Sequence, residues 1–155
     1  MTRGWLRISV VRNQGGGGVS RTSKAKPVLL VREMFTIDHL SRVRHLVRWA
    51  ARLVGLSGAR TDRLVEAVNE AAINAVAHGG GSGRLELVQH NQTSLTARVI
   101  DDGPGIPPLP VIQRPPPDAT SGRGRWLMQQ CCDKMRIRTG PRGTTVELDV
   151  ALSAL

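Results

Sequence analysis

Residues 61–78 read TDRLVEAVNEAAINAVAH and predict one long helix around which the other elements can be placed. The apolar side chains recur every three or four residues, the period of an amphipathic helix with one buried face. They are Leu64, Val65, Val68, Ala72, Ala75 and Val76. Thr61 or Asp62 is a suitable N-cap, and the three glycines at 79–81 predict where the helix ends.

A second, polar stripe runs along the same predicted helix. Its members, Glu66, Glu70, Asn74 and His78, are spaced by four and therefore stack along one face. Polar residues must fall somewhere on an amphipathic helix, so this spacing alone favours a solvated surface over a functional site. The rest of the sequence has to decide between the two interpretations.

Length and composition are those of one globular domain. The chain has 155 residues, of which 40% are hydrophobic, enough for a single core. No apolar run approaches the roughly 20 residues that cross a bilayer, and the N-terminus lacks a signal-peptide core, so we expect a cytoplasmic protein without membrane contact. Cys131 and Cys132 are too few for a disulfide framework or a cysteine zinc site, and we expect small buried hydrophobes.

The formal net charge of +10 suggests an acidic partner, with nucleic acid as the first class to consider. Six of the cations and none of the acids lie in residues 1–26, which also contain four consecutive glycines. This composition predicts a disordered basic tail over residues 1–26 and one domain over residues 27–155. Because the charge excess is largely in a tail, nucleic-acid binding is disfavoured; it would require a salt-dependent affinity that is lost on deleting the tail.

The remaining segments alternate between helix and strand patterns. We predict strands at 28–37, 84–90, 94–101, 135–140 and 144–152, and helices at 38–54, 61–78 and from about 124. This order predicts an α/β two-layer sandwich with the helices on one face of a mixed, mostly antiparallel sheet. A loop rich in proline and glycine fills residues 101–126, and a loop of that length inside a domain is usually functional.

Two parts of this loop carry chemistry. Asp101 follows a predicted buried strand, where a carboxylate needs hydrogen-bond donors, and a nucleobase amino group is one such donor. Gly103 and Gly105 permit a close approach of the backbone. Later, the run Gly122-Arg123-Gly124-Arg125 opens the last helix, where free amides bind anions such as phosphate and the arginines would add charge. Each signal alone is a common turn, and the spacing fits neither a Walker nor a Rossmann loop.

In combination the motifs are specific. The helix pattern Glu70-x-x-x-Asn74-Ala75-x-x-His78 is followed by an Asp-x-Gly-x-Gly after a strand, a Gly-x-Gly before a helix and Gly143-Thr144-Thr145 before a final strand. This order resembles the N, G1 and G2 boxes and the terminal Gly-Thr-Thr element of the GHKL superfamily of ATP-binding domains. The resemblance covers about residues 28–151 and is strongest to the bacterial anti-sigma factor serine kinases.

The resemblance implies ATP and Mg²⁺ as cofactors and gives the helix residues their roles. Asn74 would ligate Mg²⁺ through its amide oxygen, a hard ligand for a hard cation. Glu70, one turn earlier, would act as general base toward the attacking hydroxyl. His78 would lie near the phosphates or fix the helix end, and Glu66 has no role in the resemblance.

The resemblance also assigns roles to the loop residues. Asp101 would accept a hydrogen bond from the adenine amino group, with Thr145 in support, while Gly103 and Gly105 admit the base. The lid that closes over the phosphates would use the backbone amides of Gly122 and Gly124, with Arg123 and Arg125 beside them.

The implied function is an ATP-dependent protein serine/threonine kinase that phosphorylates a STAS-type anti-sigma antagonist and sequesters a sigma factor. Two departures bear on turnover more than on nucleotide binding: Arg125 stands where the family has an aliphatic residue, and the lid is rich in proline over residues 107–117. They favour the alternative of a non-catalytic ATP-binding module that sequesters a partner.

A further alternative is the detached ATPase half of a histidine kinase. Neither His39 nor His45 has the two-helix context of a phosphoacceptor, which argues against it. The sequence also allows a homodimer, because the first predicted strand of the domain, residues 28–37, could pair with its copy across a two-fold axis.

Overall fold

The structure is a computed structural model, and it describes residues 6–11, 26–106, 114–119 and 123–152. These residues contain six strands, three α-helices and one 3₁₀ turn. In chain order they are β1 (Leu6–Val11), β2 (Val28–Thr36), a 3₁₀ turn (Ile37–His39), α1 (Leu40–Leu53), α2 (Gly58–His78), β3 (Ser82–His90), β4 (Ser94–Asp101), α3 (Arg123–Cys131), β5 (Lys134–Gly140) and β6 (Gly143–Ala151).

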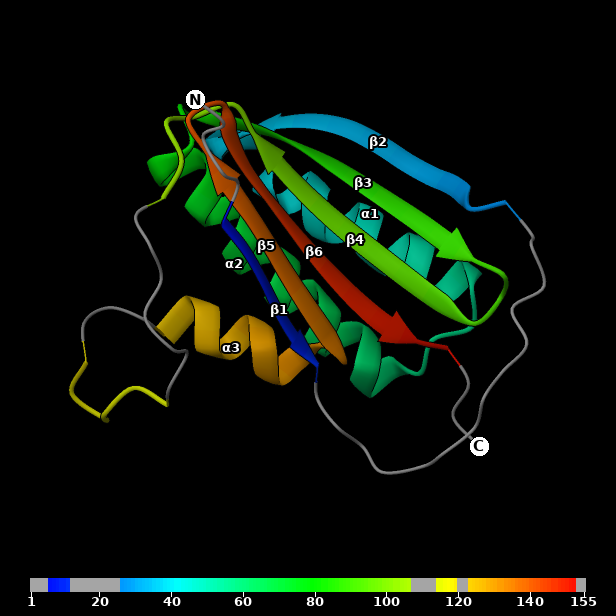
Figure 1. The fold of residues 1–155 in the computed structure, drawn as a ribbon. Helices are drawn as coiled ribbons and strands as arrows, with labels where there is room; N and C mark the ends of the chain where they lie inside the picture. The colour runs from blue at the N-terminus through cyan, green and yellow to red at the C-terminus, as the bar shows by residue number, and fades with distance from the viewer. Residues whose placement is uncertain (1–5, 12–25, 107–113, 120–122, 153–155) are drawn as a thin grey trace.

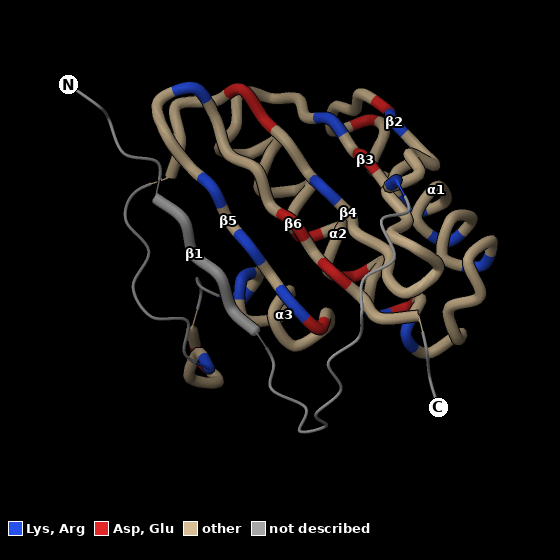
Figure 2. Tube along the Cα trace, turned by 45° about the vertical axis from the view of Figure 1, so that its right-hand side comes forward, with Lys and Arg blue, Asp and Glu red and all other residues tan. Residues whose placement is uncertain are grey.

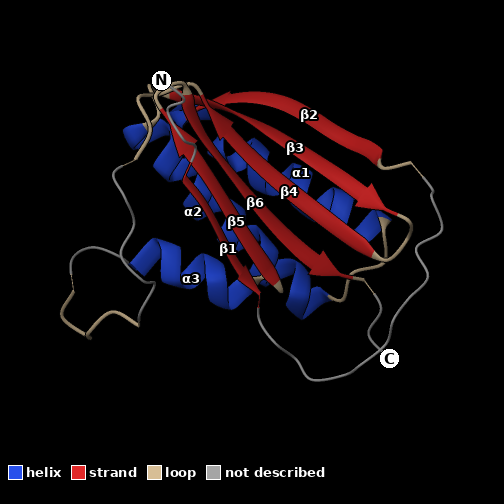
Figure 3. Cartoon of the chain, viewed as in Figure 1, coloured by secondary structure: helices blue, strands red, loops and turns tan. Residues whose placement is uncertain are grey.

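The strands form one sheet in the order β1-β5-β6-β4-β3-β2, and the three helices cover one of its faces (Figures 1 and 3). This arrangement confirms the predicted α/β two-layer sandwich. Every pairing among the described strands is antiparallel, so the sheet is not mixed. The short connections of the β3–β4 and β5–β6 hairpins account for two of the five pairings.

The prediction of a disordered tail over residues 1–26 is wrong for residues 6–11, which form β1 and pair with β5 at the sheet edge. The sequence there, LRISVV, is rich in β-branched residues, and the edge of β5 offers it a row of backbone partners. The hydrogen bonds of a strand therefore outweigh the polar composition around it. Residues 1–5 and 12–25, also in the predicted tail, lie outside the described residues.

The core lies between the helices and the sheet. α2 buries Leu64, Val68 and Ala72 completely, and they pack against the inward side chains of β3, β4 and β6. Complete burial of a leucine or valine contributes about 1.5–3 kcal/mol to the transfer free energy. Among the described helices, none has the length and apolarity to cross a membrane.

Both long helices begin elsewhere than predicted. α2 starts at Gly58, and its N-cap is Ser57, whose hydroxyl accepts a hydrogen bond from the Arg60 amide, so Thr61 and Asp62 lie inside the helix. Ser57 is as good a cap as Thr61, and the one-turn extension buries Thr61 against the core. Asp38 lies in the 3₁₀ turn, and α1 follows from Leu40.

The other face of the sheet carries a row of ion pairs. Neighbouring strands place Arg32, Glu86, Arg98, Glu147 and Arg136 opposite one another in register, with alternating sign. Figure 2 shows these charges as bands along the strands. The two carboxylates are nearly buried, with side chains 8% and 5% exposed, beneath the more exposed arginines. We call this the open face.

Candidate functional site

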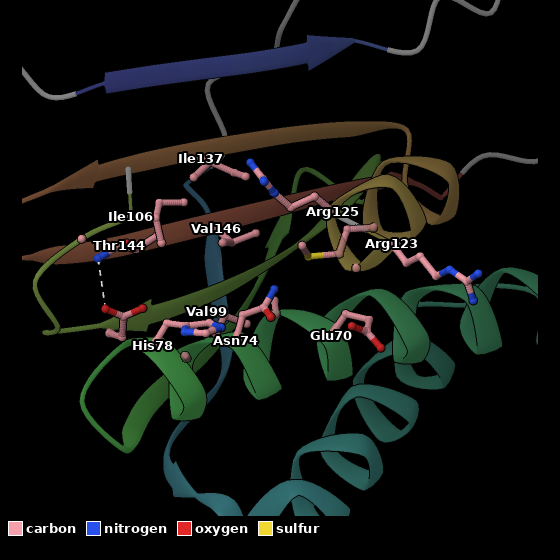
Figure 4. A pocket seen from close by; sticks show the side chains of 16 residues that line it. Glu70, Asn74, His78, Val99, Ile106, Arg123, Arg125, Ile137, Thr144 and Val146 are labelled. Carbon is pink, nitrogen blue, oxygen red and sulfur yellow. Dashed lines mark hydrogen bonds between the residues drawn. The ribbon is translucent and has the colours of Figure 1, made fainter. Parts of the chain in front are cut away.

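A cavity of about 670 Å³ lies between α2, the start of α3 and the strands of the sheet (Figure 4). Its volume falls within the range of small-molecule sites. It is lined by Glu70, Ala71, Asn74, Ala75, His78, Val99, Asp101, Gly105, Ile106, Arg123, Gly124, Arg125, Met128, Ile137, Thr144 and Val146. Eight of the eleven predicted site residues are among them.

The polar stripe of α2 forms one wall of the cavity. Glu70, Asn74 and His78 line it at successive turns, and the small side chains of Ala71 and Ala75 between them leave space in front of the helix. Within the described part of the chain, none of the three polar side chains has a hydrogen bond or an ion pair. Their donors and acceptors are therefore open to a ligand.

Asp101 lies at the end of β4 and is held by backbone amides. Its Oδ1 accepts hydrogen bonds from the Gly103 amide at 3.0 Å and from the Thr144 amide at 3.3 Å, the bond drawn in Figure 4. Its Oδ2 has no protein donor among the described residues. The carboxylate is thus fixed through one oxygen and offers the other to the cavity.

The glycines after Asp101 serve two different purposes. Gly105 lines the cavity at φ +85°, and a Cβ there would lie 2.4 Å from the Gly140 carbonyl oxygen, so no larger residue fits. Gly103 is buried and does not line the cavity. Its Cα packs on Gly79 at the end of α2, where an added Cβ would lie 2.5 Å from the Gly79 Cα.

The placement of Thr145 in the site is wrong, and the neighbouring Thr144 takes that position. Successive residues of a strand point to opposite faces. Thr144 shares the inward face with Val146 and Leu148, whereas Thr145 pairs with Ile100 and Arg138 on the open face. The alternation of the buried residues in β6 is a signal that would have identified Thr144.

The start of α3 closes the cavity over Glu70. A Cβ added at Gly124 would lie 2.9 Å from Glu70 Oε2, the flexible end of that side chain, so the backbone of α3 lies close to the Glu70 carboxylate. Arg123 lines the cavity but is exposed, and its guanidinium donates to the Pro117 carbonyl. Gly122 lies outside the described residues.

Arg125 extends from α3 toward Ile137 on the sheet side of the cavity (Figure 4). Its Nη1 is buried and has no hydrogen-bond partner among the described residues. A buried guanidinium N–H without an acceptor is unfavourable, so an acceptor atom of a ligand in the cavity would stabilise this group.

Sequence reasoning missed the apolar walls. Val99 and Val146 lie on adjacent strands, while Ile106, Met128 and Ile137 come from a loop, α3 and β5. The strand residues are in phase with the core residues around them, so their position beside the core was predictable. That they border a cavity was not, because this depends on how α3 packs.

Metal-ligating side chains and the thiol of Cys132 were the other candidates for chemistry within the described residues. No group of three or more histidine, cysteine, aspartate or glutamate side chains could hold a metal ion there. Burial raises the pKa of the Cys132 thiol to about 12, with Asp133 and Asp149 contributing, so it stays protonated at neutral pH.

A second hollow adjoins the cavity at Glu70. It has a volume of about 790 Å³ and shares Glu70, Arg123 and Gly124 with the first. Its other walls are Arg114, Pro115, Pro116, Pro117, Trp126 and Leu127. Glu70 therefore lines both spaces.

Comparisons with known proteins agree with this geometry. The model of a family described as the histidine kinase-like ATPase domain matches residues 34–150. The structure of the RsbU and RsbW domains of Rv1364c from Mycobacterium tuberculosis is similar in fold, with a TM-score of 0.60 at 22% identity. That match covers 81% of this chain and 33% of the other. No curated protein matches the sequence.

Proposed function

The chain belongs to the family of histidine kinase-like ATPase domains, and from this we propose that it binds ATP with Mg²⁺ and phosphorylates a serine or threonine of a partner protein. The polar stripe of α2 carries the proposal. Glu70 and Asn74 lie one turn apart, line one cavity and have no partner among the described residues. Phosphoryl transfer uses such a pair, one group to orient the attacking hydroxyl and one to hold the metal.

The base would bind at the Asp101 end of the cavity. The free Oδ2 of Asp101 would accept a hydrogen bond from the adenine amino group, and the Thr144 hydroxyl lies on the same side. Val99, Ile106 and Val146 supply apolar walls for the faces of the ring. A few polar atoms on apolar walls are what fixes the orientation of a small ligand.

The phosphates would lie along α2 toward Glu70. Asn74 lines the cavity and would hold Mg²⁺ together with the phosphate oxygens, since this ion is usually bound through few protein ligands and the phosphates of the substrate. When bound, the ion neutralises phosphate charge. The unpaired Arg125 Nη1 would donate to a phosphate. His78 lines the cavity at the C-terminal end of α2, which Gly79 brings against Asp101, so it would lie nearer to the base than to the phosphates.

The transfer step itself uses Glu70. The hydroxyl oxygen of the acceptor forms a bond to the γ-phosphorus, the bond from that phosphorus to ADP breaks, and Glu70 takes the hydroxyl proton. The acceptor would reach Glu70 through the second hollow, since Glu70 lines both spaces.

The likeness to the RsbW-containing structure favours a partner-regulating kinase over a metabolic enzyme. We assign the acceptor to the class of STAS-type anti-sigma antagonists and the sequestered partner to the sigma factors. Two copies would pair along β2, which forms a free edge of the sheet within the described residues.

A second candidate is a non-catalytic ATP-binding module that sequesters its partner. The observation that favours it is the contact of Gly124 with Glu70, because the start of α3 lies against the carboxylate that an attacking hydroxyl has to reach. In that case ATP would only set the conformation of α3.

A transfer assay separates the two candidates. The full chain is incubated with γ-labelled ATP and a panel of purified STAS-domain proteins, and ATP affinity is measured in parallel by calorimetry. Glu70→Gln should slow transfer by about 10²–10⁴-fold while ATP affinity stays within about 3-fold. The control is Glu66→Gln, an exposed residue of the same helix. Saturable ATP binding with no label transferred to any acceptor would favour the second candidate.

A further inference from the structure

Thr139 of β5 lies outside every motif of the sequence and outside the lining of the cavity. Its side chain is 4% exposed and faces the helices. The Ile106 amide donates to its Oγ1 at 2.9 Å, and the Thr144 Oγ1 lies 2.9 Å away. The Thr139 hydroxyl therefore links the loop after β4 to the start of β6. Both of its hydrogen-bond partners, Ile106 and Thr144, line the cavity.

The direction of these hydrogen bonds follows from counting protons. A threonine hydroxyl has one proton to donate and can accept two hydrogen bonds. The Ile106 amide uses one acceptor position of Thr139, and the buried proton of Thr139 needs an acceptor of its own. Within the described residues that acceptor is Thr144 Oγ1. Thr144 thus keeps its own proton for an acceptor in the cavity.

A donor at Thr144 beside an acceptor at Asp101 distinguishes the two purines. Adenine presents an amino donor next to a ring-nitrogen acceptor, whereas guanine presents a carbonyl acceptor next to a ring N–H donor. With guanine, the carbonyl would face the Asp101 carboxylate and the ring N–H would face the Thr144 proton. Sites that leave polar groups unpaired in this way reject the wrong ligand strongly.

The same hydroxyl holds the loop against β5. Gly105, next to Ile106, approaches β5 so closely that an added Cβ would lie 3.1 Å from Thr139 Oγ1 and 2.4 Å from the Gly140 oxygen. Ile106 contributes its side chain to the apolar wall of the cavity. Thr139 thereby holds both the Ile106 side chain, which forms part of the wall of the base pocket, and the Thr144 hydroxyl, which is the donor in that pocket.

We propose that Thr139 is a positioning residue that makes the site selective for adenine over guanine nucleotides. This inference rests on the proposed function, because it assumes that the cavity binds a purine nucleotide. It concerns a residue that touches no ligand and acts through Thr144 and Ile106.

The test compares ATP and GTP dissociation constants, with Mg²⁺, for the full chain and its variants. Thr139→Val keeps the shape and removes the hydroxyl, and it should weaken ATP binding about 10-fold, the equivalent of one lost hydrogen bond. GTP binding should change by less than about 2-fold, so the ATP preference narrows. Thr139→Ser should restore both values, because it restores the hydroxyl.

Thr96→Val is the matched control. Thr96 is 2% exposed and donates to Asp149 at 2.6 Å on the open face, so this variant loses a buried hydroxyl bond away from the cavity. Its ATP-to-GTP ratio should stay that of the unmodified chain even if its melting temperature falls. If the role of Thr139 were merely structural, the Thr139→Val protein would likewise keep the ATP-to-GTP ratio of the unmodified chain while its melting temperature falls.

An unchanged ratio in Thr139→Val, or a Thr139→Ser protein as impaired as Thr139→Val, would overturn the inference while leaving ATP binding intact. If Thr139→Val does not fold, Thr139→Cys takes its place, because a thiol is a weak donor and a weak acceptor and the same outcomes apply. Failure of the unmodified chain to bind ATP would overturn the proposed function itself, and the inference with it.

Discussion

The two faces of the sheet differ in whether their polar side chains have partners within the described protein. On the open face, Glu147 is 5% exposed and lies within 4 Å of Arg98, Arg136 and Arg138. On the helix face, Glu70 and Asn74 of α2 have no partner among the described residues, and Arg125 Nη1 is buried without one. The carboxylate of Glu147 has partners within the protein, whereas the side chains of Glu70 and Asn74 have none among the described residues.

This difference distinguishes structural polar residues from functional ones. An unpaired polar group near a cavity costs free energy, and natural sites bear that cost where a ligand supplies the missing partner. Removing a residue of the open face should therefore reduce stability and spare nucleotide binding. Removing a polar residue of the cavity should weaken nucleotide binding and leave the stability of the fold nearly unchanged.

The largest expected effect is that of Asp101→Asn. The amide would present its own protons or a weaker acceptor to the adenine amino group, and ATP affinity should fall about 100-fold. Calorimetric titration measures it. Asp102→Asn is the control, since Asp102 is the exposed neighbour and loses the same charge. An equal loss in both variants would mean that general charge, not base recognition, is involved.

Glu147→Gln tests the open face. It leaves three arginines without their shared carboxylate, and the free energy of unfolding, measured in urea, should fall by about 2 kcal/mol. ATP affinity should not change. The control is Glu66→Gln, at an exposed position without an ion pair in the described structure. Its free energy of unfolding should stay within about 0.5 kcal/mol of the unmodified chain.

The effect of Glu147 should also depend on pH. Burial raises the pKa of Glu147, but Arg136, Arg138 and Arg98 together outweigh it and hold the pKa below its usual value of 4.5. A carboxyl with a lowered pKa stabilises the fold above its unfolded-state pKa and loses that contribution as the pH falls through the folded-state value. The stability difference between the unmodified chain and Glu147→Gln should thus shrink below about pH 4.5. A difference that grows on acidification would contradict this origin.

The smallest expected effect on stability is that of Asn74→Ala. The unfolding free energy should stay within about 0.5 kcal/mol, because Asn74 has no partner to lose. The affinity for Mg²⁺–ATP should nevertheless fall about 10-fold. A loss of stability as large as that of Glu147→Gln would place Asn74 in the structure rather than in the site.

The sequence predicted which residues line the cavity where its periodicity was unambiguous. The spacing of Glu70, Asn74 and His78 required only that α2 be a helix, and the position of Asp101 required only that β4 end there. The prediction for Thr145 was wrong because successive side chains of a strand point to opposite faces of the sheet. The motif alone did not determine which of the two threonines points inward. The alternation of Val146, Leu148 and Val150 contained the missing information.

Other features depend on tertiary contacts that no local pattern encodes. β1 forms because β5 offers an edge, although its surroundings in the sequence are polar and rich in glycine. Arg125 looked like a departure from the family pattern, and only the packing of α3 shows that its Nη1 is buried beside the cavity. Thr139 belongs to no motif, and its importance arises from where the loop after β4 crosses β5.

The contrast between the two faces is tested most directly by methyl NMR during a titration with Mg²⁺–ATP. Val99, Ile106, Ile137 and Val146 line the cavity, whereas Val88 and Ile100 lie on the open face. We predict saturable shifts at the first four methyl-bearing residues with much smaller changes at the other two. Uniform shifts on both faces, or no saturable change up to millimolar ATP, would contradict the account.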